Sequence, residues 1–67
     1  MELERVIFEM VSGRQMTFRG ESAKRVLNFF DKDGNITSNP LVINDDNGVT
    51  TDIVYVQNIE CVRFLYE

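Results

Sequence analysis

The chain has 67 residues, of which 43% are hydrophobic and 27% are charged, with one cysteine, no histidine and a net charge of −4. A single cysteine excludes an internal disulfide, and without histidine it cannot complete a zinc site. We therefore expect one folded domain over residues 1–67, with a thin core and no cofactor.

The first residues predict a β-hairpin. Apolar and polar residues alternate over residues 3–11, which is the period of a strand with one face against a core. Ser12 and Gly13 form a turn signal, because glycine accepts the backbone angles of a tight hairpin, and residues 14–19 form the returning strand. The side chains expected to face the core are Val6, Phe8, Met10, Met16 and Phe18.

A helix is predicted after Gly20. Ser22 is a good N-cap, because its hydroxyl can accept a hydrogen bond from an unpaired amide of the first turn. Apolar residues then recur with the spacing i, i+3, i+4 and i+7, which makes one stripe that can lie on a sheet. We expect the helix to end near Asp31, where turn residues begin. The stripe consists of Ala23, Val26, Leu27 and Phe30.

Three further strands are predicted in the second half of the chain, over residues 41–43, 50–57 and 60–66. Asn47 and Gly48 are a hairpin signal between the first two of these strands, and residues 58–59 form a tight corner before the last. The order β-β-α-β-β-β with short connections predicts an α+β fold, in which one helix covers an open side of a curled, five-stranded antiparallel sheet.

Four apolar residues on either side of the corner at residues 58–59 have a spacing that resembles the last two strands of SH3-like and Sm-like barrels. These residues are Ile53, Tyr55, Ile59 and Val62. The resemblance implies that the sheet could close into a small SH3-like barrel.

The stretch from Asp31 to Asn35 starts like a calcium-binding EF-hand loop, with oxygen-bearing side chains at loop positions 1, 3 and 5. An EF-hand also needs glycine at position 6 and glutamate at position 12, but this chain has Ile36 and Val42 there. We therefore predict a turn that ends the helix, and no metal site.

Five carboxylates lie in or beside the predicted loops, and they would gather if these loops meet at one end of the sheet. A row of carboxylates attracts a basic protein surface and speeds the encounter with it, whereas scattered ones are ordinary solvated charges. The first reading suggests a small non-enzymatic protein-interaction module, such as a phage or mobile-element accessory protein that binds a host protein. The candidate partner-binding residues are Asp31, Asp33, Asp45, Asp46 and Asp52.

Four basic residues between residues 14 and 25 form an alternative site. If they line one face of the second strand and the helix, they would contact phosphate, and the protein would be a small nucleic-acid- or nucleotide-binding barrel. The net negative charge and the lack of interleaved aromatic residues argue against nucleic acid as a partner. The alternative phosphate-binding residues are Arg14, Arg19, Lys24 and Arg25.

The sequence offers no catalytic set. General acid–base catalysis most often uses histidine, which is absent, and a cysteine nucleophile would need a base that the chain lacks. Cys61 lies among apolar neighbours in the last strand, where we expect it to pack as a small hydrophobic residue. We therefore do not expect an enzyme.

The last strand carries bulky residues on both faces, namely Phe64, Leu65 and Tyr66. Such a strand either pairs with another chain or is covered by its own fold, so a homodimer through this strand is one of two expectations.

No apolar run is long enough to span a membrane, and the first residues lack the features of a signal peptide. We therefore expect a cytoplasmic protein with a protein partner.

Overall fold

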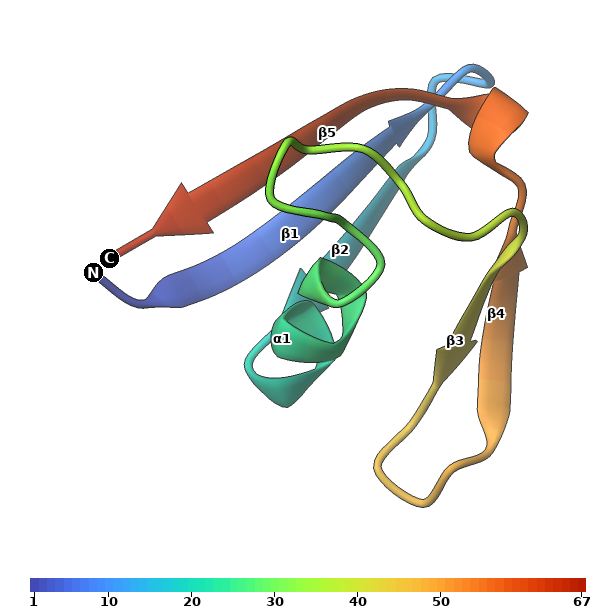
Figure 1. Cartoon of the computed structure of the whole chain (residues 1–67). Helices are drawn as coiled ribbons and strands as arrows, with labels where there is room; N and C mark the ends of the chain where they lie inside the picture. The colour runs from blue at the N-terminus through green and yellow to red at the C-terminus, as the bar shows by residue number, and fades with distance from the viewer.

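A computed structural model describes residues 1–67 and contains two antiparallel sheets and one α-helix. The larger sheet has the strand order β2-β1-β5, and the smaller one is a β3–β4 hairpin. The helix α1 lies between the two sheets (Figure 1). The elements are β1 (Leu3–Met10), β2 (Gln15–Arg19), α1 (Glu21–Leu27), β3 (Leu41–Asn44), β4 (Thr50–Val54), the 3-10 helix η1 (Val56–Asn58) and β5 (Ile59–Tyr66).

The structure confirms the predicted α+β class, the five antiparallel strands and the single helix, but not the single sheet. The prediction of one five-stranded sheet is wrong, because β3 pairs only with β4 and β2 pairs only with β1. The strands therefore do not close into an SH3-like barrel. The physical reason is visible in Figure 1, where α1 and the segment that follows it fill the space in which β2 and β3 would have to meet.

The β1–β2 hairpin follows the alternation of its sequence. Val6 lies opposite Phe18 and Phe8 opposite Met16, which places these four side chains on one face of the sheet. The rings of Phe8 and Phe18 meet edge to face with their centroids 5.2 Å apart. Gly13 closes the turn with a φ of 89°, a backbone angle that other residues rarely adopt.

The helix begins earlier and ends earlier than predicted. Gly20, with a φ of 57°, is the residue at its N-cap, and the Ser22 hydroxyl accepts a hydrogen bond from the Arg25 side chain (3.1 Å), so Ser22 is not the cap. The amides of Asn28, Phe29 and Phe30 bond to carbonyls three residues back, which is the tighter pattern of a helix end. Leu27 is consequently exposed, contrary to prediction.

One hydrophobic core joins the two sheets and the helix. The β3–β4 hairpin contributes three residues to this core, the helix contributes two and the larger sheet contributes three. Because the two sheets share no backbone hydrogen bonds in a common ladder, the packing of these side chains holds the hairpin in place. The buried residues are Val6, Phe8, Phe18, Ala23, Val26, Leu41, Ile43 and Val54.

The β3–β4 hairpin is apolar on both faces. Leu41 and Val54 lie opposite each other and are buried, whereas the neighbouring pair of Val42 and Ile53 points to the other side and is exposed. A hairpin usually exposes a polar face, so the exposed apolar pair departs from the usual pattern. No helix in the structure has the length and apolar character needed to cross a membrane.

Candidate functional site: a groove between the two sheets

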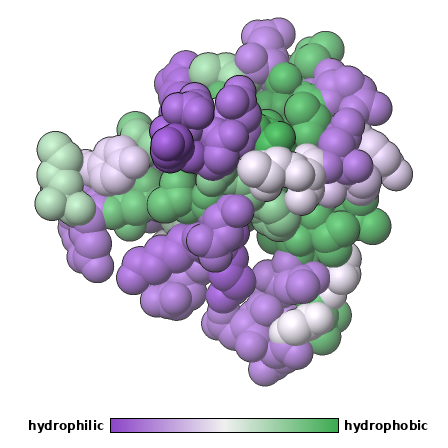
Figure 2. Space-filling view, viewed as in Figure 1, coloured by the Kyte–Doolittle hydropathy of each residue, from purple (hydrophilic) through white to green (hydrophobic).

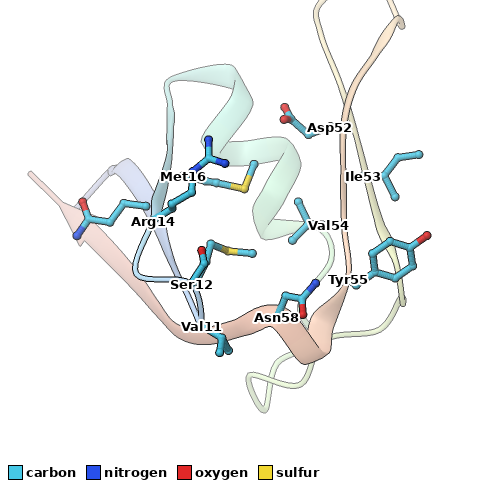
Figure 3. A pocket seen from close by; sticks show the side chains of 11 residues that line it. Val11, Ser12, Arg14, Met16, Asp52, Ile53, Val54, Tyr55 and Asn58 are labelled. Atoms are coloured by element: carbon cyan, nitrogen blue, oxygen red, sulfur yellow. The ribbon is translucent and has the colours of Figure 1, made fainter.

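A groove of about 690 Å³ separates the β1–β2 turn from β4. Figure 3 shows Met16 and Arg14 on one side, and Val54 and Asp52 reaching toward them from the other. Met16 and Val54 belong to the hydrophobic core or pack against it, so the floor of the groove is apolar. The lining residues are Met10, Val11, Ser12, Arg14, Gln15, Met16, Asp52, Ile53, Val54, Tyr55 and Asn58.

Hydrogen bonds fix the closed end of this groove. The Val11 amide donates to the Asn58 carbonyl (2.8 Å), which ties the β1–β2 turn to η1. The Asn39 side chain accepts a hydrogen bond from the Val56 amide (3.1 Å) and so ties the start of β3 to the same helix. Both walls of the groove are therefore anchored at η1.

The groove runs beside strands that are each paired on one side only. β2 and β4 lie at the edges of their sheets, so the unpaired backbone amides and carbonyls along each free edge can receive another strand. β4 is the sequence Thr-Thr-Asp-Ile-Val, which contains neither proline nor lysine, and Asp52 is its one charged residue. An extended chain could therefore pair with β4.

Exposed apolar side chains lie beside the groove and on the outer side of β4. Val11, Ile53 and Tyr55 are 62%, 56% and 48% exposed, although residues of these types are usually buried. Ile53 and Tyr55 point to the outer side of β4 in Figure 3, which extends the apolar surface beyond the groove itself. Figure 2 shows hydrophobic residues gathered on the side of the molecule where β4 meets η1.

The groove also carries two opposite charges that have no partner in the chain. Arg14 and Asp52 project from opposite walls (Figure 3), and neither belongs to any of the ion pairs of the structure. Because both remain in water, each can bind a charged group of an incoming molecule.

The structure does not bring the five predicted partner-binding carboxylates together. The turn of Asp31 and Asp33 and the β3–β4 turn of Asp45 and Asp46 lie well apart in Figure 1, and no three acidic or cysteine side chains form a group that could hold a metal ion. Asp46 makes an ion pair with Arg25 (2.9 Å), and Asp52 lies in the groove. Their joint role in partner binding stays a prediction.

The stretch from Asp31 to Asn35 is a turn, as predicted. One carboxylate oxygen of Asp31 accepts hydrogen bonds from the amides of Asp33 and Asn35, each 2.9 Å long. Asp45 does the same for Asn47 (2.8 Å) and Val49 (3.0 Å) in the β3–β4 turn. Both carboxylates therefore serve to fold their own loops.

The Asp31 turn leads to a pH-dependent prediction. The hydrogen bonds from the amides of Asn35 and Asp33 lower the pKa of Asp31 below its usual value. Because the pKa is lower in the folded state, the carboxylate stabilises the fold above its unfolded pKa, and this effect is lost as the pH falls through the folded pKa. We expect Asp31→Ala to lower the melting temperature by a few degrees at neutral pH, and the difference from the wild type to shrink below about pH 4. A difference that is the same in melts at both pH values would contradict this account.

The four basic residues of the alternative site are also dispersed. Lys24 makes ion pairs with Glu21 (3.5 Å) and Glu2 (3.9 Å), and Arg25 is held by Asp46. Arg14 lies at the groove, whereas Arg19 lies at the far end of β2, roughly 16 Å along the strand. A common phosphate-binding face for these four residues stays a prediction that their positions do not favour.

The prediction that Cys61 packs as a small hydrophobic residue is wrong, because its side chain is exposed. Cys61 lies opposite Glu9 of β1, on the face of the larger sheet that points away from the core. We expect the folded protein to react with one equivalent of a thiol reagent at the rate of a free thiol and to keep its circular dichroism spectrum. A thiol that reacts only after denaturant is added would contradict this placement.

The last strand is covered on one face only. Val62 and Phe64 of β5 pack against the core, and the ring of Phe64 meets Phe30 edge to face at 5.2 Å. Leu65 and Cys61 lie on the opposite, open face. A homodimer through this strand stays a prediction.

Comparison of the chain with protein-family models, with curated proteins and with solved structures finds no match.

Proposed function

We propose that the protein is a non-enzymatic protein-interaction module that binds an extended segment of a partner in the groove beside β4. The observation that carries this proposal is a groove with an apolar floor along the free edge of β4, with the exposed side chains of Val11 beside it and of Ile53 and Tyr55 on the outer side of the strand. An added strand gains main-chain hydrogen bonds from the edge and specificity from the side-chain contacts.

The geometry also describes the segment that would fit. A strand along β4 points every second side chain toward the floor formed by Met16 and Val54, so we expect apolar residues at alternate positions. The flexible Met16 side chain can adapt to different shapes of apolar residue. An acidic residue would be placed at Arg14 and a basic residue at Asp52.

The charge of the chain favours a basic partner. The net charge of −4 attracts proteins of opposite charge over long distances and repels the phosphates of nucleic acids. This part of the proposal keeps the acidic protein-interaction module suggested by the sequence, but it moves the contact surface from the loops to the groove.

A peptide library displayed on a surface and selected on the purified protein tests this function. We expect the selected peptides to share alternating apolar residues and to have no helical periodicity, since only an extended chain fits a sheet edge. Selection on a variant with Ile53→Asp is the matched control and should not enrich the same peptides. Helical peptides, or the same peptides from both selections, would contradict the proposal.

A further inference from the structure

The face of the larger sheet that points away from the core carries two arginines directly opposite each other. Val6 and Phe18 point into the core, so their neighbours in the chain, Arg5 and Arg19, point outward. These two arginines are register partners on β1 and β2. The Cβ atoms of such partners are about 5 Å apart, which places both guanidinium groups within reach of one small ligand.

Like charges that face each other across a sheet are destabilising, and the chain gives a counter-charge to only one of these two, the Glu4 carboxylate beside Arg5. Arg19 takes part in none of the ion pairs or side-chain hydrogen bonds. The only acidic contact of Arg5 is Oε1 of Glu4, 3.5 Å from its Nε, and this Nε is buried without a hydrogen-bond partner. A buried donor without an acceptor often marks the place of a bound ion or water.

Arg63 on the same face provides a comparison within the molecule. It lies on β5 opposite Ile7, and its guanidinium binds Glu9 at 2.9 Å. The chain therefore pairs one of the three outward-facing arginines closely with an acid and leaves the other two with most of their donors free. On this face of the sheet, the unpaired donors belong to Arg5 and Arg19.

We propose that Arg5 and Arg19 form a binding site for a phosphate group. Each guanidinium presents five N–H donors in a planar fork that matches phosphate oxygens two at a time. A phosphate has more acceptor oxygens than a carboxylate, so it can bind both guanidinium groups at once and reduce their repulsion.

This site is independent of the proposed peptide groove. Arg5 and Arg19 lie on the outer face of the larger sheet, whereas the groove opens between the sheets near Arg14, at the other end of β2. Failure of phosphate binding would therefore leave the proposed function untouched, and failure of peptide binding would leave this site untouched.

An NMR titration of the backbone amides and arginine Nε–H groups with inorganic phosphate, at constant ionic strength, tests the site. We expect saturable shifts centred on Arg5 and Arg19, and an affinity at least about tenfold lower in Arg5→Gln and in Arg19→Gln, because each removes charged hydrogen bonds. Arg14→Gln is the matched control and should bind phosphate as the wild type does.

A parallel titration with acetate separates phosphate from carboxylate recognition, and a titration with a simple phosphate monoester tests whether the phosphate is accepted when it belongs to a larger molecule. Weaker binding of acetate and retained binding of the monoester support the proposal. Shifts that do not saturate, acetate binding as tight as that of phosphate, or equal losses in Arg14→Gln would overturn it.

Discussion

Replacing Phe8 by alanine is expected to destabilise the protein strongly. Phe8 of β1 is fully buried and contacts Phe18 edge to face. Truncation of a buried phenylalanine costs about 3–5 kcal/mol. A domain of 67 residues has a total stability of about 3–10 kcal/mol, so this one change removes a large share of it. Urea denaturation followed by circular dichroism measures the loss.

Ile7→Ala is the matched control for this variant. Ile7 directly precedes Phe8 in the same strand and is likewise a residue type that favours strands. It points to the outer face, however, and is only partly buried. We expect a much smaller decrease in the urea midpoint, because less apolar surface leaves the core. Equal losses for the two variants would show that β1 does not have the orientation described here.

The second large effect is expected at the groove. We expect Ile53→Asp to weaken the binding of a selected peptide by roughly 30-fold or more, because it places a charge on the strand that receives the peptide and removes an exposed apolar contact. Tyr55→Ala should weaken binding to a similar extent, since aromatic side chains dominate many interfaces. Calorimetric titration of each variant with the peptide measures the change.

Neither variant should unfold the protein, because both side chains are about half exposed. Val49→Asp is the matched control: Val49 is 59% exposed in the β3–β4 turn and does not line the groove. We expect it to bind the peptide with wild-type affinity. Equal losses from Val49→Asp would assign the effect to added negative charge rather than to the groove.

Local sequence signals predicted the kind and order of the main elements, but the helix ends earlier than predicted, and the strand predicted over residues 50–57 ends at Val54, before the 3-10 helix η1. The alternation around Val6 and Phe8 located the first hairpin and its buried face, and glycines marked both hairpin turns. These features depend on a few neighbouring residues, through the period of a strand and the backbone freedom of glycine. The α+β class followed from their order along the chain.

The arrangement of the strands could not be predicted in the same way. Whether β3 pairs with β2 depends on the space taken by α1 and the residues after it, which no local pattern records. The same limit applies to Cys61, whose apolar neighbours predicted burial although the outer face of its sheet is open. The exposed pair of Val42 and Ile53 likewise became visible only when the register of β4 was known.

The candidate groove was therefore missed by sequence reasoning, apart from Arg14 and Asp52. The sequence assigns these two residues to different sites, because they belong to clusters of opposite charge along the chain. The structure places them on opposite walls of one groove. The absence of lysine and proline from β4 was the available signal, but it has a meaning only once the strand is known to lie at an edge.

Hydrogen exchange of the backbone amides, with and without a saturating selected peptide, tests the central claim most directly. We expect the peptide to slow exchange at amides of β4 that point away from β3, because they would gain hydrogen bonds to an added strand. Exchange in the Asp31–Asn35 turn should be unchanged. Protection confined to the acidic turns or to β5, with β4 unaffected, would contradict the assignment of the groove as the binding site.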